Sequence, residues 1–145
     1  MGLGYAFQSN GAIMSNPGLF ATVAPDDLLA FGRGADFNPK LVVDWMDLSK
    51  NEVSKIASVA KASVRYDDAA PRAVVERLEE IANIANMVAG IFEGDLAKAA
   101  LWFRTKNPML GDISPRDMVR LGRYDRLRKF IVTAIVDRTP QRSAA

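Results

Sequence analysis

The sequence contains no cysteine and no histidine among its 145 residues. Without cysteine, the chain has no disulfide, no thiolate zinc site and no cysteine nucleophile. Without histidine, it lacks the commonest general base and the commonest metal ligand. Adjacent carboxylates such as Glu79 and Glu80 would diverge on a helix and so do not form a catalytic pair. We therefore predict a protein that is not an enzyme and has no metal site and no cofactor.

Long apolar runs are also missing. No segment approaches the roughly 18 uncharged apolar residues of a membrane-spanning helix. The start of the chain, "MGLGYAFQSNGAIMSNPG", has neither the basic beginning nor the apolar block of a secretion signal. Because 49% of the residues are apolar, the chain can fill the core of one compact domain. We expect a cytoplasmic protein with no membrane contact.

The charge is distributed unevenly, although the net charge is only +2. Residues 98–129 contain three acidic and nine basic side chains, a local excess of +6. Such a surface attracts phosphate groups or acidic proteins, and the alternative is an ordinary solvated helix face. The basic residues are Lys98, Arg104, Lys106, Arg116, Arg120, Arg123, Arg126, Arg128 and Lys129.

The hydrophobic pattern predicts an all-α fold. Residues 1–37 are rich in glycine, serine, asparagine and proline, which indicates a flexible N-terminal arm. From Asn38 onward, apolar residues recur at helical spacing, and no stretch alternates with the period of a strand. We expect a helical body over residues 38–137 and a C-terminal tail at 138–145.

Two helix starts are well marked in the segment 38–70. Asn38 can cap a helix whose first residue is Pro39, and Ser49 with Glu52 has the spacing of a capping box. The stretch "LSKNEVSKIASVAKASV" resembles an Xre or Cro-type helix-turn-helix, in which a recognition helix enters the major groove of DNA. The resemblance implies a DNA-binding unit over residues 38–70 that contacts DNA through Lys50, Lys61, Ser63, Arg65 and Tyr66.

Two residues depart from that pattern. Ser58 stands where the turn usually has glycine, and Ala60 replaces the hydroxyl residue that usually caps the recognition helix. The unit also lacks the excess of basic residues expected of a DNA-binding module. A helical hairpin that serves only packing is the alternative.

A long helix is predicted after Pro71. Its apolar stripe steps by four and three residues over about six turns and ends near Gly94; the stripe is Val74, Leu78, Ile81, Ala85, Val88 and Phe92. Further apolar residues widen this surface, so we expect the helix to pack on two sides. One side is predicted to form a homodimer contact through Ile84, Met87 and Ile91, and burial within the monomer is the alternative.

Residues 96–135 contain a distinctive series of helix and turn signals. A helix ends in tryptophan, an Asn-Pro-x-Leu-x-Gly turn follows, the next helix is opened by proline and closed by glycine, and the last helix is amphipathic. The residues in this series are Trp102, Asn107, Pro108, Leu110, Gly111, Pro115, Gly122, Leu127 and Ile131. The series resembles the toxin-binding domain of the Xre/MbcA/ParS antitoxin family. With the helix-turn-helix and the long helix that joins the two, the resemblance extends over residues 38–135. The long helix after Pro71 and the toxin-binding domain together occupy residues 71–137.

This resemblance implies an antitoxin. Members of the family are encoded beside a RES-domain toxin, which consumes NAD or uses it to modify a target, and they inhibit the toxin by covering its active site. Many also repress their own operon, which adds operator DNA as a partner. The residues expected to contact the toxin are Trp102, Asn107, Pro108, Leu110, Arg120, Arg123, Arg126 and Arg128. The alternative is a DNA-binding transcriptional regulator without a toxin partner.

Overall fold

The computed structural model describes the backbone of residues 25–144 and the side chains of residues 25–137. All helices and turns in this range are consistent with the all-α prediction, and the described part of the chain contains no strand. The α-helices are α4 (Pro39–Met46), α5 (Lys50–Ala57), α6 (Arg72–Ile91), α7 (Leu96–Arg104), α8 (Pro115–Arg120) and α9 (Tyr124–Ala144). The described residues also form three 3-10 turns: η1 (Gly34–Asp36) before α4, η2 (Lys61–Ser63) between α5 and α6, and η3 (Pro108–Leu110) between α7 and α8.

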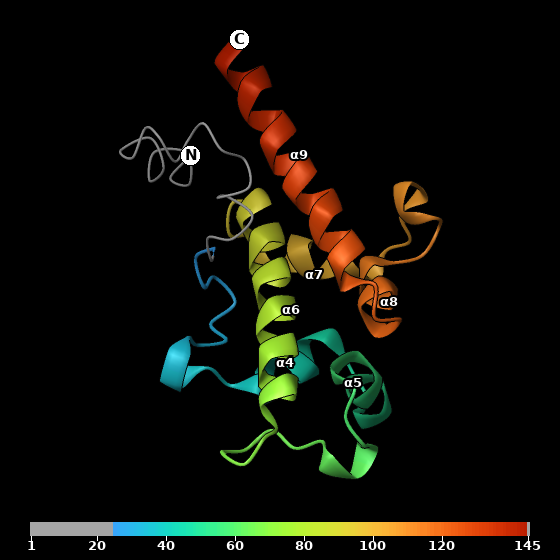
Figure 1. Cartoon of the computed structure of the whole chain (residues 1–145). Helices are drawn as coiled ribbons and strands as arrows, with labels where there is room; N and C mark the ends of the chain where they lie inside the picture. The colour runs from blue at the N-terminus through green and yellow to red at the C-terminus, as the bar shows by residue number, and fades with distance from the viewer. Residues whose placement is uncertain (1–24, 145) are drawn as a thin grey trace.

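Helix α6 lies at the centre of the molecule. It contacts α4 and α5, and it also contacts α7 and α9 (Figure 1). The apolar stripe predicted from the sequence is buried, with Val74, Leu78 and Ile81 fully shielded from solvent. The folded chain therefore covers α6 from more than one side.

This covering places Ile84 and Met87, two of the three residues predicted to form a homodimer contact, in the core of the single chain. Ile84 is 0% exposed and Met87 is 8% exposed within a single chain, and Ile91 is half-buried. Neighbouring helices of the same chain cover the wide apolar surface of α6. Helices α4 and α5, which precede it in the sequence, and α7 and α9, which follow it, all pack on it. Ile84 and Met87 are core residues, so an acidic substitution there would disrupt folding rather than report on association.

The predicted helix starts are confirmed. The Asn38 side chain accepts a hydrogen bond from the Lys40 amide at 3.1 Å. At the start of α5, the Ser49 hydroxyl accepts from the Glu52 amide at 3.1 Å, and the Glu52 carboxylate accepts from the Ser49 amide at 2.8 Å. These caps satisfy backbone amides that have no partner inside the helix, which fixes where α4 and α5 begin.

The predicted recognition helix is not an α-helix. The chain forms only the 3-10 turn η2 at Lys61–Ser63, and no side chain caps its start. Ala60 has no oxygen with which to accept the first free amides. Val64, which follows, is extended and 3% exposed. The chain therefore enters the core directly after η2.

The predicted flexible arm is wrong for residues 25–37, while residues 1–24 lie outside the described part of the chain. Phe31 is 2% exposed and packs edge-to-face on Trp45 of α4, with ring centroids 6.3 Å apart. The sequence "DDLLAFGRG" forms a turn rather than a helix. This segment is therefore part of the folded body.

A hydrogen-bonded pair holds the segment to α6. The buried Asn86 side chain accepts from the Leu29 amide at 2.9 Å and donates to Asp27 Oδ1 at 3.1 Å. The Asp27 carboxylate also accepts from the amides of Phe31 and Gly32, at 3.0 and 2.9 Å. Buried polar groups that all find partners fix one arrangement of the chain.

We expect Asn86→Ala to lower the free energy of unfolding by about 1–3 kcal/mol, because it leaves the Leu29 amide and Asp27 without their buried partner. Urea unfolding followed by circular dichroism measures this. Asn83→Ala, on the same helix but without such a bond in the described structure, should stay within about 0.5 kcal/mol of wild type. Equal losses in the two variants would contradict the role assigned to Asn86.

Stability should also depend on the ionisation of Asp27. Partial burial raises the pKa of this carboxyl, but hydrogen bonds from Gly32, Phe31 and Asn86 outweigh it and hold the pKa below the ordinary value of 3.8. Its contribution is therefore complete above pH 3.8 and is lost as the pH falls through the lower value of the folded state. We expect Asp27→Asn to flatten the acid loss of stability below about pH 4, as measured by urea unfolding at a series of pH values, and an unchanged slope would contradict this role of Asp27.

The C-terminal helix is longer than predicted. Helix α9 continues to Ala144 through most of the segment predicted as a tail, and its last turns extend past the other helices (Figure 1). In the described part of the chain, no helix combines the length and the apolar character needed to cross a membrane.

Candidate functional site

The loop between α7 and α8 is built by Asn107. Its side chain accepts from the Met109 amide at 2.9 Å, and its own amide donates to the carbonyl of Ile113 at 3.0 Å. Pro108 opens the 3-10 turn η3, and Gly111 closes it at a φ of 84°, where side chains other than glycine are strained. The loop thereby brings residues 109–113 to one surface.

The corner between α8 and α9 lies opposite this loop. Ser114 caps α8 by accepting from the Asp117 amide at 3.1 Å, and Gly122 has a φ of 77° at the corner itself. Leu127 and Ile131 of α9 are buried in the core. Arg126 and Phe130 lie on an adjacent face of α9, and Arg123 lies directly before the first residue of the helix.

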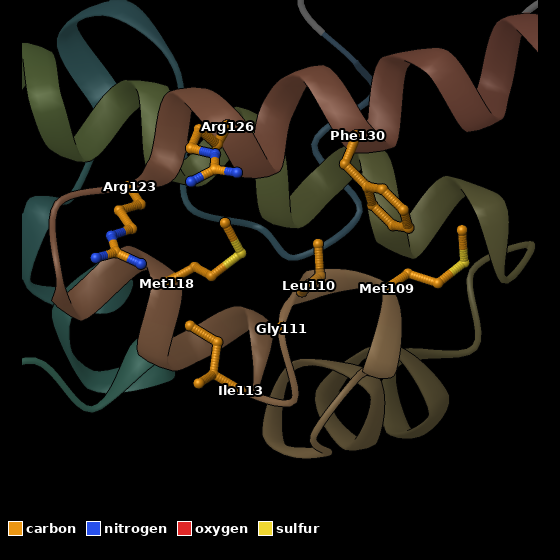
Figure 2. Close-up of a pocket in the computed structure, with 8 residues that line it drawn as sticks. All are labelled: Met109, Leu110, Gly111, Ile113, Met118, Arg123, Arg126 and Phe130. Carbon is orange, nitrogen blue, oxygen red and sulfur yellow. The ribbon is translucent and has the colours of Figure 1, made fainter.

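This loop and this corner enclose a pocket of about 400 Å³ (Figure 2). Figure 2 shows Arg123 and Arg126 together at one end, Met109 and Phe130 at the other, and apolar side chains between them. We call it the arginine pocket; it is lined by Met109, Leu110, Gly111, Ile113, Met118, Arg123, Arg126 and Phe130.

The two arginines of the pocket differ from others nearby. Arg116 pairs with Asp47 at 2.8 Å, and Arg120 pairs with Glu52 at 3.0 Å and Asp117 at 3.4 Å. Within the described residues, Arg123 and Arg126 are exposed and have no such carboxylate partner. The positive charge of the pocket is thus not neutralised by any of the side chains that the structure describes.

The chemistry of the pocket favours binding. Its described lining supplies apolar surface and guanidinium donors. Its volume falls within the range of about 300–1,000 Å³ that is usual for ligand pockets. A carboxylate or phosphate can bind at the arginine end while an apolar group occupies the rest.

Three of the residues predicted to contact a toxin line this pocket: Leu110, Arg123 and Arg126. Two others have structural roles within the chain. Trp102 packs edge-to-face on Phe103 at 5.2 Å, and Asn107 organises the loop. Neither they nor Pro108 and Arg128 line the pocket.

Arg120, which was also predicted to contact a toxin, is engaged within the chain. It is only partly exposed, because its ion pair with Glu52 joins α8 to α5. Glu52 also forms the capping box of α5, so one carboxylate orders both a helix start and the α5–α8 contact.

The sequence did not identify Met109, Gly111, Ile113, Met118 and Phe130 as site residues. Phe130 is half-buried at the edge of the pocket. The spacing of Arg123, Arg126 and Phe130 could have placed these three together at the start of α9, with Arg123 directly before its first residue. Nothing in the sequence indicates that the loop at 109–113 faces them.

The residues predicted to contact DNA are arranged unevenly. Lys50, Lys61 and Ser63 are exposed. Arg65 is held by Asp67 through two hydrogen bonds of 2.7 and 2.5 Å, and this contact lowers the pKa of Asp67. Tyr66 is half-buried, and its hydroxyl has no hydrogen-bond partner among the described residues. The five side chains therefore do not form one free basic surface.

No protein-family model, curated protein or solved structure matches this chain.

Proposed function

We propose that this chain is an antitoxin, a stoichiometric protein inhibitor whose target is a RES-domain toxin encoded in the same operon. The observation that carries the proposal is the arginine pocket. It is built from the loop and helix corner that resemble the toxin-binding domain, and it exposes two guanidinium groups without carboxylate partners in the described chain. An apolar pocket with unneutralised charge at one end is suited to hold a partner protein.

Operator binding, the other function expected of the chain, has less support from the geometry. The segment expected to enter the major groove is one 3-10 turn, and Arg65 is engaged by Asp67. A helix-turn-helix needs a recognition helix long enough to present several side chains to base edges. We therefore place inhibition of a protein partner first and treat promoter repression as the alternative function.

Co-expression with the neighbouring gene product tests the proposal. The wild-type chain should restore growth and cellular NAD, and it should be recovered in a complex with that product in a pull-down. If the neighbouring protein depletes NAD and this chain neither protects cells nor binds it, the antitoxin proposal is wrong. A promoter fragment in the same series measures DNA binding separately.

A further inference from the structure

The arginine pocket is concave, and its two arginines are part of its wall. Arg123 and Arg126 lie beside each other at one end, with Leu110 and Met118 between them and Phe130 (Figure 2). A concave surface receives a protruding group of the partner. These guanidinium groups are therefore placed to bind what enters the pocket, rather than to reach into a catalytic site on another protein.

From this arrangement we propose that the arginine pocket receives a protruding acidic segment of the partner, with one large apolar side chain in the pocket and two carboxylates on Arg123 and Arg126. The proposal rests on the proposed function, because it assumes a protein partner. Guanidinium groups bind carboxylates through paired hydrogen bonds, and an apolar anchor in a pocket is the usual centre of a protein contact.

The apolar part of the pocket favours a peptide segment. Met109 is 78% exposed, and Met118 lies inside the pocket, so methionines contribute both to its rim and to its floor. Methionine side chains are flexible and polarisable, and they adapt to the shape of a bound side chain. Such a rim extends the contact surface beyond the pocket, as an extended segment requires.

The distribution of charge argues against a nucleic acid in this place. A nucleic acid needs a continuous basic track along its phosphates. In the basic stretch 98–129, Arg116 and Arg120 are engaged by Asp47, Glu52 and Asp117. What remains at the pocket is a local pair of arginines beside apolar surface, which matches a short acidic and apolar sequence.

Synthetic 15-residue peptides that tile the neighbouring gene product provide the test, with binding to the full-length chain measured by fluorescence anisotropy. We expect the binding peptides to contain two carboxylates within about four residues and a large apolar side chain. Arg123→Glu with Arg126→Glu should weaken their binding by about 100-fold. Replacing the two peptide carboxylates with lysine should restore binding to that variant.

The apolar anchor is tested with a matched pair of exposed residues. Met109→Ala, at the rim of the pocket, should weaken peptide binding by about tenfold. Leu101→Ala, on α7 and outside the pocket, removes a side chain that is 66% exposed and should have no effect. Equal effects of the two substitutions would overturn the proposal.

Other outcomes separate this inference from the proposed function. If the intact neighbouring protein binds the wild-type chain and the charge-reversed chain equally, the pocket proposal is wrong while the antitoxin proposal stands. If that protein does not bind at all, both fail. Tight binding of a labelled 20-nucleotide DNA strand, lost on the same charge reversal, or of a peptide that copies residues 1–24 of this chain, would replace the acidic partner segment with another occupant.

Discussion

Reversing the two pocket charges, with Arg123→Glu and Arg126→Glu together, should abolish protection against the neighbouring gene product. Any carboxylate held by these arginines would then face two carboxylates in a contact from which water is excluded. Like charges placed together in an interface cost several kcal/mol, which corresponds to a loss of affinity of about 100-fold or more. Growth and cellular NAD during co-expression measure the effect.

The fold should tolerate this change. Both arginines are exposed, and they lie at the beginning of α9, where negative charge is favourable to the helix dipole. We expect the free energy of unfolding to change by less than about 0.5 kcal/mol per substitution. A normal unfolding curve would therefore assign the loss of protection to the pocket rather than to misfolding.

A matched control is available in the N-terminal helices. Lys50→Glu with Lys61→Glu changes the net charge by the same amount at two exposed positions that do not line the pocket. This variant should protect cells as well as wild type does. Because both lysines were expected to contact DNA, its promoter affinity also tests the alternative function. Loss of protection in this control would show that net charge, and not the pocket, matters.

Phe103→Ala should have the largest effect on stability, lowering the free energy of unfolding by about 3–5 kcal/mol. Phe103 is 1% exposed and makes edge-to-face contacts with Trp45 and Trp102, both at 5.2 Å between ring centroids. Trp45 in turn packs on Phe31, so these aromatic rings connect the segment before α4 with α7. Removing the ring leaves a cavity where both parts of the chain meet.

Urea unfolding should show one transition shifted to lower urea, seen alike by tryptophan fluorescence and circular dichroism. Most domains have only about 5–15 kcal/mol of stability, so this loss leaves the variant marginally folded. Leu101→Ala, on the same helix but 66% exposed, should change stability by less than about 0.5 kcal/mol. A loss below 1 kcal/mol for Phe103→Ala would contradict a shared aromatic core.

The features that the sequence predicted correctly are local ones. Ser49 and Glu52 are three residues apart. When Ser49 caps the start of a helix, this spacing lets each side chain accept a hydrogen bond from the backbone amide of the other residue. The predicted cap of α4 by Asn38 is equally local, because its side chain accepts from the Lys40 amide two residues on. Such signals depend only on neighbouring residues, so they could be read without knowledge of the fold.

The features that were missed depend on residues far apart in the chain. Asp27 and Asn86 are separated by 59 positions, and nothing near Asp27 indicates that its partner lies on α6. Arg120 looked like a free arginine because its partner, Glu52, is on α5. Ile84 and Met87 looked available for a dimer because periodicity shows how wide an apolar surface is but not which helix covers it.

The candidate site combines both kinds of feature. The motif around Asn107 and the arginines of α9 could be recognised separately in the sequence. Only the fold brings Leu110 against Arg126 and Phe130 to form one pocket. The same fold gives Trp102 and Arg120 partners within the chain, since one packs on Phe103 and the other pairs with Glu52.

The most direct test of the central claim is a titration of the purified neighbouring gene product with this chain while NAD consumption is recorded. For an inhibitor that acts by stoichiometric binding, activity should fall in proportion to added wild-type chain and reach zero at a fixed molar ratio. The control variant with Lys50→Glu and Lys61→Glu should stop NAD consumption at the same molar ratio as the wild-type chain. The variant with Arg123→Glu and Arg126→Glu should leave NAD consumption by the neighbouring gene product unchanged. Undiminished NAD consumption in excess wild-type chain, or full inhibition by the pocket variant, would contradict the account.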